Sequence, residues 1–103
     1  MIKYKITNAT PNEIKGTSLK GYIEATKQQL VDVLGEPTNT YESDKTSMEW
    51  HFVMIDKGKR IPITIYDYKD KYVGGVYTWH IGGKEAIVLF HISKLFPNNE
   101  ITR

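Results

Sequence analysis

The chain of 103 residues contains no cysteine. Disulfide bonds, zinc sites built from thiolates and cysteine nucleophiles are therefore excluded, and the composition fits a reducing compartment. Long hydrophobic runs are also missing, because no apolar stretch approaches the about 18 residues of a membrane-spanning helix. The first ten residues, MIKYKITNAT, alternate polar and apolar side chains, which is typical of a strand and not of a signal peptide. We expect no association with a membrane.

A strong net charge is missing too. The chain has 14 basic and 12 acidic residues, a net charge of +2, and its lysines are scattered along the sequence. Nucleic-acid binding is not expected, because domains that bind DNA usually carry a clustered basic face. A mild positive surplus is compatible with an anionic small ligand or with an acidic patch on a protein partner.

The composition is otherwise that of a globular protein, with 40% hydrophobic and 25% charged residues. We expect one domain over residues 1–103. Its predicted parts are a strand-and-loop extension at 1–18, a core at 19–96 and a frayed tail at 97–103.

Periodicity two predicts strands, and periodicity 3.6 predicts helices. Strands are predicted at 2–6, 19–25, 46–55, 61–69 and 76–81, with a loop at 8–18 and a hairpin turn at 56–59. One side of the 46–55 strand is apolar and is predicted to face the core: Met48, Trp50, Phe52 and Met54.

Two helices are predicted from their end signals. Thr26 and Gln29 form a capping box at the start of the first helix, and Gly35 is its predicted C-cap. The second helix follows Gly83 and carries an apolar stripe over 88–96. The predicted fold class is α+β, with a curved, mainly antiparallel sheet of three to five strands and both helices packed on one face.

Gly82, Gly83 and Lys84 lie where the last strand is predicted to join the second helix. The first N–H groups of a helix lack partners, two glycines allow a ligand to approach the backbone, and a lysine adds positive charge. These residues are a candidate phosphate site. The alternative is a plain strand-to-helix turn, and the GxxxxGK[ST] phosphate-loop pattern is absent.

Aromatic residues near this junction are candidates for stacking a nucleobase: Tyr66, Tyr68, Trp79 and His80. Alternation places Trp79 on the face predicted to lie under a helix and His80 on the opposite face. His80, Tyr66 and Tyr68 are therefore better ligand candidates than Trp79. Simple packing is the alternative for each aromatic residue.

The three histidines, His51, His80 and His91, do not have the spacing of a metal-binding motif. His80 with Asp67 would resemble an oriented general base, but no nucleophile motif accompanies them. We predict no catalytic residue, no metal site and no cofactor, and whether the histidines converge in space is left open.

Five segments together resemble a group of small proteins encoded by tailed bacteriophages: GYIEA at 21–25, LGEP at 34–37, MEW at 48–50, TIYDYK at 64–69 and WHIGGK at 79–84. The resemblance covers roughly residues 16–96. The chain departs from the pattern at Tyr68, where a tryptophan is expected, and in the connection 69–77.

The resemblance implies an accessory protein in the host cytoplasm, of a kind that often acts against host defence. The first hypothesis is a non-catalytic protein that sequesters an anionic nucleotide signal, as a symmetric homodimer with shared pockets. The second is an inhibitor that occludes a host defence protein, in the manner of an anti-CRISPR protein, through the hairpin edge or the tyrosines. A third is a small nucleotide hydrolase acting through His80.

Overall fold

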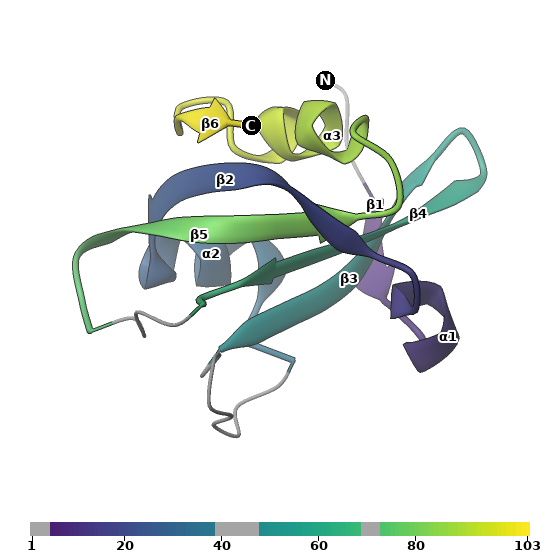
Figure 1. Cartoon of the computed structure of the whole chain (residues 1–103), viewed down its shortest axis with the longest axis horizontal. Helices are drawn as coiled ribbons and strands as arrows, with labels where there is room; N and C mark the ends of the chain where they lie inside the picture. Colours follow the sequence, from purple (N-terminus) through teal and green to yellow (C-terminus); the bar gives the residue numbers. More distant parts are fainter. Residues whose placement is uncertain (1–4, 39–47, 69–72) are drawn as a thin grey trace.

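A computed structural model describes residues 5–38, 48–68 and 73–103. Six strands form one sheet in the order β1-β3-β4-β5-β2-β6, and every neighbouring pair is antiparallel (Figure 1). The strands are β1 Lys5–Asn8, β2 Ser18–Thr26, β3 Glu49–Asp56, β4 Lys59–Tyr66, β5 Val76–Gly83 and β6 Ile101–Thr102. The helices are α1 Pro11–Ile14, α2 Lys27–Leu34 and α3 Val88–Leu95.

The predicted α+β class with an antiparallel sheet is confirmed, whereas the predicted counts of strands and helices are wrong. One additional strand is β6, which pairs with β2 where a frayed tail was expected. Asn99 secures this tail, because its side-chain amide donates to the carbonyl of Glu24 at 2.9 Å. Parts of the predicted strand at 2–6, the strand at 46–55 and the connection at 69–75 fall outside the described residues.

Helix α1 lies in the segment 8–18, where only a loop was predicted. Thr10 and Glu13 form a capping box, in which the Thr10 hydroxyl accepts from the Glu13 N–H at 3.2 Å and the Glu13 carboxylate accepts from the Thr10 N–H at 2.9 Å. Pro11 occupies the first turn, where a missing N–H is tolerated. The sequence T-P-N-E therefore carried a helix signal of the same kind as Thr26 and Gln29.

The sheet has an apolar face that bears the core, called here the core face, and an opposite outer face. Both tryptophans lie in the core, edge to face with ring centres 5.3 Å apart. The Trp50 indole N–H donates to the Gly35 carbonyl at 2.8 Å, and that of Trp79 donates to Ala25 at 2.9 Å. The core comprises Ile23, Ala25, Leu30, Trp50, Phe52, Met54, Ile61, Ile63, Ile65, Trp79, Ile81, Val88, Ile92 and Phe96.

The predicted apolar stripe of β3 is confirmed, because its central members are buried in this core and Met48 packs against it. The turn between β3 and β4 is also confirmed. Lys57 and Gly58 both have positive φ, 51° and 80°, which is the conformation of a tight hairpin turn.

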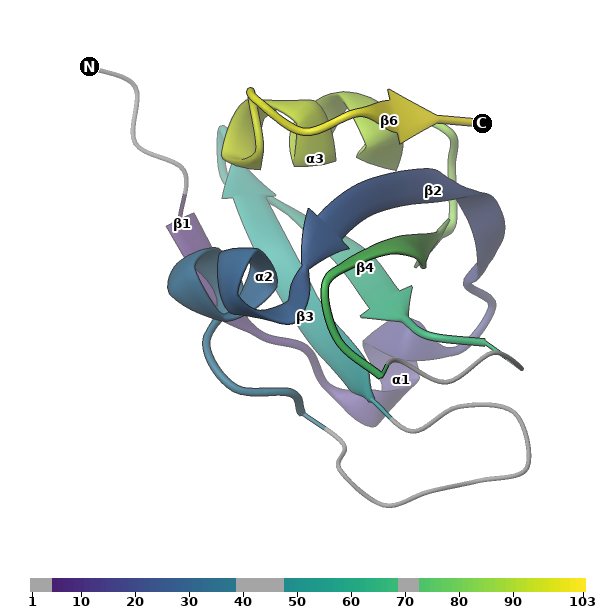
Figure 2. The same ribbon diagram turned by 90° about the vertical axis from the view of Figure 1, so that its left-hand side faces the viewer.

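Helices α2 and α3 cover different ends of the core face (Figure 2). The predicted box at Thr26 and Gln29 is confirmed, and the helix ends at Gly35 with φ 84°. Helix α1 instead contacts β4 near Arg60, on the side of the outer face. The predicted arrangement, with two helices on one face and none elsewhere, is therefore wrong, because the additional helix α1 lies toward the other face.

Candidate functional site

A row of side chains crosses four strands on the outer face. Strand register pairs Tyr22 of β2 with His80 of β5, His80 with Tyr66 of β4, and Tyr66 with Glu49 of β3. Side chains at directly opposed positions of neighbouring strands lie on the same face and contact one another. Local alternation predicted that His80 faces away from the core, but the row itself depends on the pairing of distant strands.

Three tyrosines surround the His80 imidazole. Its ring centre lies 5.4 Å from that of Tyr66 with the planes 24° apart, a stacked arrangement. Tyr22 lies edge-on at 5.1 Å, and Tyr68 is tilted at 5.3 Å. We call these four residues the aromatic cluster. All four rings are partly exposed, so the cluster presents aromatic surface to solvent.

Two members of the cluster have shifted pKa values that favour their neutral forms. Burial lowers the pKa of His80, and the carboxylate of Asp67 opposes this shift. Its Nδ1 atom is buried and has no hydrogen-bond partner in the described part of the chain. Burial raises the pKa of Tyr66, and the negative charge of Glu49 raises it further. The neutral imidazole and phenol forms are therefore the relevant ones for binding.

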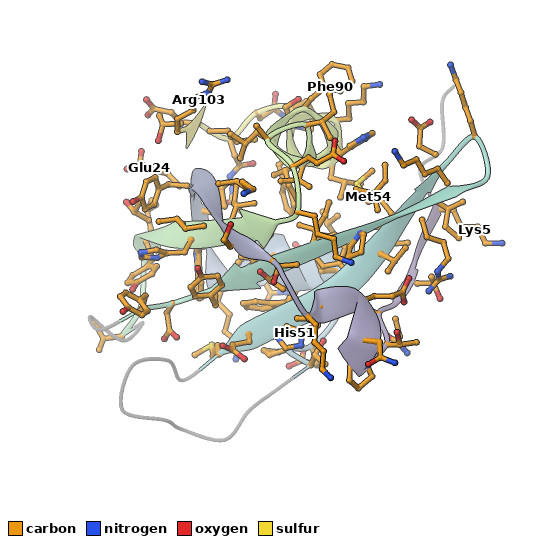
Figure 3. All side chains as sticks on the ribbon, turned by 45° about the vertical axis from the view of Figure 1, so that its right-hand side comes forward. Lys5, Glu24, His51, Met54, Phe90 and Arg103 are labelled. Carbon is orange, nitrogen blue, oxygen red and sulfur yellow. The ribbon has the colours of Figure 1, made fainter. Side chains whose placement is uncertain are left out.

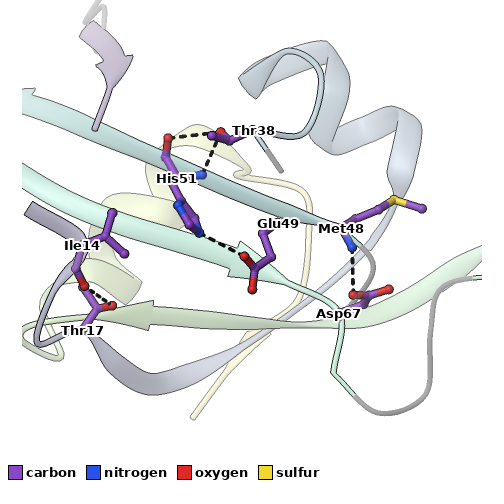
Figure 4. A network of polar contacts seen from close by, with 7 residues as sticks. All are labelled: Ile14, Thr17, Thr38, Met48, Glu49, His51 and Asp67. Carbon is purple, nitrogen blue, oxygen red and sulfur yellow. Dashed lines mark hydrogen bonds and ion pairs between the residues drawn. The ribbon is translucent and has the colours of Figure 1, made fainter. Parts of the chain in front are cut away.

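Asp67 has a structural role between Tyr66, the last residue of β4, and Tyr68. It is fully buried, and its carboxylate accepts from the Met48 N–H at 3.1 Å (Figure 4). Its own N–H donates to the Met48 carbonyl at 3.3 Å. The next residue, Tyr68, donates its N–H to the hydroxyl of Tyr77 at 3.3 Å. These contacts fix the chain on both sides of Asp67 and thereby position Tyr66 and Tyr68.

Two hollows flank the row. One, of about 380 Å³, lies beside His80 and Tyr68 and is bordered by Tyr77 and Thr78. The other, of about 300 Å³, lies between Tyr66 and the segment that follows α1. A hollow edged by ring surfaces accommodates a planar aromatic group, because stacked and edge-on ring contacts are both favourable.

The second hollow has a polar lining. His51 contacts the Glu49 carboxylate at 3.3 Å, and Thr38 holds the His51 backbone through two hydrogen bonds (Figure 4). Hydroxyl groups of Ser18 and Thr64 also line it. Sequence reasoning missed the contribution of Glu49, Tyr22 and the α1 segment, since only the sheet register places them beside Tyr66.

The predicted helix start at Gly82 and Gly83 is wrong, because both residues belong to β5 and are buried. Helix α3 begins later, at Val88, and its N-cap Ile87 makes no side-chain capping bond. A Cβ atom on Gly83 would lie 2.6 Å from Val88, and one on Gly82 would lie 2.3 Å from the Thr64 hydroxyl. The glycines therefore allow close packing on both faces of the sheet, and they do not lie at a helix N-terminus, on which the predicted phosphate site depended.

The predicted ligand residues thus separate into groups. His80, Tyr66 and Tyr68 come together in the aromatic cluster. Trp79 is fully buried in the core and is not part of the aromatic cluster, which agrees with the packing alternative. Lys84 is exposed and borders a different depression, beside α3.

The three histidines do not form one site. His51 and His80 lie on the outer face, whereas His91 belongs to α3. Across residues 5–38, 48–68 and 73–103, no three histidine or acidic side chains are grouped closely enough to hold a metal ion. None of the helices in the same ranges has the length and apolar character needed to cross a membrane.

Comparisons with protein families, with curated proteins and with solved structures found no match to this chain. The resemblance to phage proteins therefore stays a prediction from the sequence, and any function has to be argued from the outer face.

Proposed function

We propose that the chain is a non-catalytic binding protein that sequesters a nucleotide by stacking its base on the aromatic cluster. The observation that carries this proposal is the row in which Tyr22, His80 and Tyr66 lie side by side on three strands. Stacking of a base on an aromatic side chain contributes about 1–3 kcal/mol, and it tolerates different bases. Burial lowers the pKa of His80 and so favours the neutral imidazole, whose ring face can stack on a base.

The phosphates of such a ligand would not bind at Gly82 and Gly83. Lys20 is the cation that we place nearest to them, because its ammonium donates to the Ser18 hydroxyl at 2.8 Å and Ser18 lines the hollow beside Tyr66. Hydroxyl groups of this hollow add hydrogen-bond donors. Glu49 opposes a phosphate on its own side, so the phosphates would lie toward β2.

The biological setting of the proposal comes from the phage resemblance. An accessory protein in the host cytoplasm would counter host defence by binding a nucleotide signal and keeping it from its receptor. Both hollows are open and small for a whole dinucleotide, so a homodimer that joins two clusters would enclose more of the ligand.

A protein-interaction inhibitor is the second candidate, and the charge beside the cluster favours it. Glu24 and Glu49 carry carboxylates on the outer face, which suit a basic protein surface better than a phosphate. Tyrosines at the centre of a patch with a polar rim are the usual anchors of protein interfaces. A host defence protein would then cover the same cluster.

A thermal-shift panel separates the two candidates. It would contain cyclic di- and trinucleotides, ADP-ribose and ordinary mononucleotides. A ligand at a hundredfold excess over Kd stabilises the folded chain by about 2.7 kcal/mol, which raises Tm. A shift for one nucleotide supports sequestration. A flat panel, together with a host protein retained by the wild-type chain and lost with Tyr66→Ala, supports the inhibitor instead.

A further inference from the structure

A large depression lies away from the aromatic cluster. It has a volume of about 570 Å³ and runs between the β3–β4 hairpin and the start of α3. We call it the hairpin groove. Apolar side chains from both elements form its walls: Ile61, Pro62, Ile87 and Val88. Its volume lies within the range of about 300–1,000 Å³ that is typical of sites for small molecules.

Two charged residues at the hairpin groove, Arg60 and Glu13, form an ion pair with each other. Arg60 holds the Glu13 carboxylate with two hydrogen bonds, of 2.8 Å and 2.9 Å. Glu13 also accepts from the Thr10 N–H, so this carboxylate is committed to fixing α1 against the hairpin. Neither charge is available to a ligand.

Four further charges border the hairpin groove: Asp56, Lys59, Lys84 and Glu85. Among the residues that the structure describes, none of these four makes an ion pair within 4 Å. Two positive and two negative groups thus border one apolar depression, and all four remain available to a ligand.

His91 lines the same groove from α3. Only 5% of its surface is exposed, and its Nδ1 atom is buried without a hydrogen-bond partner in the described ranges. Burial lowers the pKa of the imidazole and so favours its neutral form, although Asp56 opposes the shift and Lys94 and Lys59 add to it. A buried polar side chain without a partner, at the wall of a depression, points to a ligand that completes its hydrogen bonding.

We propose that the hairpin groove binds a small zwitterion with an apolar side chain, of the class of a free amino acid or a dipeptide. The ligand carboxylate would lie toward Lys59 and Lys84, and the ammonium toward Asp56 and Glu85. A purely anionic ligand would meet the two carboxylates, and a purely cationic one would meet the two lysines. Only a molecule with both charges matches the whole border, and an apolar side chain matches the walls.

The test is an NMR titration of the ¹⁵N-labelled chain with glycyl-L-leucine. The expected result is saturable shifts confined to residues 56–62 and 84–91, together with a shift of the His91 ring signals. N-acetylglycyl-L-leucine lacks the ammonium and glycyl-L-leucinamide lacks the carboxylate, so each should bind at least about fivefold more weakly. Equal binding of all three dipeptides, or no saturable shift in these segments, would overturn the proposal.

Two lysine variants give an independent check. Lys59→Met and Lys84→Met each remove one charge and keep most of the length of the side chain, and each should weaken dipeptide binding by about threefold to tenfold. Lys15→Met is the matched control, because Lys15 is exposed and does not line the hairpin groove. If both groove variants, with Tm unchanged, bound glycyl-L-leucine as tightly as this control, the assignment would be wrong. The site needs no part of the aromatic cluster, so its outcome is separate from that of nucleotide binding.

Discussion

The imidazole of His80 stacks on the phenol ring of Tyr66, with ring centres 5.4 Å apart and ring planes 24° apart. The two residues come from neighbouring strands, β5 and β4, and their contact is set by the pairing of Tyr66 with His80 in the sheet register. The pair is the centre of the aromatic cluster, so changes at either ring test the proposed binding surface directly.

Two substitutions of Tyr66 should distinguish the contribution of its ring to nucleotide binding from that of its hydroxyl. Tyr66→Leu removes a stacking surface and should weaken nucleotide binding by about 1–3 kcal/mol, whereas Tyr66→Phe keeps the ring and should retain most of it. Isothermal titration measures both. Phe90→Leu is the control, since Phe90 is an aromatic residue of α3 outside the aromatic cluster and it is 52% exposed (Figure 3). Equal losses for the leucine and phenylalanine variants of Tyr66 would argue against stacking.

Lys20 should matter only if the ligand is anionic. Lys20→Met is expected to weaken nucleotide binding by about 0.2–1 kcal/mol, because the ammonium is close to the surface and screened by solvent. The effect should shrink as salt is added. Titrations at low and high ionic strength measure it, and a loss that does not depend on salt would contradict a phosphate contact.

Gly83 should be needed for packing and not for a ligand. Its absent Cβ would lie 2.6 Å from Val88, so Gly83→Ala should destabilise the chain by about 1–3 kcal/mol in urea unfolding. Adding Val88→Ala makes room for the new methyl group, and the two changes should therefore be less than additive. Strict additivity would show that the glycine acts in another way.

Protonation of Glu13 should destabilise the fold at low pH. The Arg60 hydrogen bonds, and then the Thr10 N–H, lower the pKa of this carboxyl from 4.5 to about 2. Because the pKa is depressed in the folded state, the stabilisation is complete above pH 4.5 and is lost as the pH falls toward 2. Urea midpoints over this window should fall more for the wild type than for Arg60→Met. Parallel pH profiles would rule out a stabilising pair.

Protonation of His80 should also destabilise the folded state. Burial lowers its pKa below the ordinary 6.5, so the folded state resists the charged form. Its contribution to stability is therefore constant above pH 6.5 and declines as the pH falls through the unfolded and then the folded pKa. NMR titration of the His80 ring should give a midpoint below 6.5. A midpoint above 6.5 would mean that Asp67 outweighs burial.

The elements that the sequence predicted well depend on local signals. Thr26, Gln29 and Gly35 define the ends of α2 through contacts within one helix, and the turn at Lys57 and Gly58 needs only two residues with positive φ. The same local signal was present at Thr10 and Glu13, where it was overlooked among turn-forming residues.

The elements that the sequence predicted poorly depend on pairing between distant strands. Gly82 and Gly83 continue β5 because Ser18, Leu19, Ile63 and Thr64 pair with them, although glycines before an apolar stripe suggest a helix start. Strand β6 exists only through its pairing with β2.

The residues of the candidate site also divide into those indicated by local signals and those placed by pairing between distant strands. Alternation along one strand separated His80 from Trp79, which the structure bears out. Two side chains that complete the site come from distant parts of the chain: Tyr22 is 58 positions from its partner His80, and Glu49 is 17 positions from its partner Tyr66. No local pattern could therefore indicate them.

The most direct test of the central claim is a proton NMR titration that observes the ring signals of His80 and of a nucleotide found in the thermal-shift panel. Stacking on the aromatic cluster predicts saturable upfield shifts of the base protons and of the His80 ring protons, and their loss in Tyr66→Leu. Saturable binding that leaves the His80 and Tyr66 rings unchanged would contradict the account.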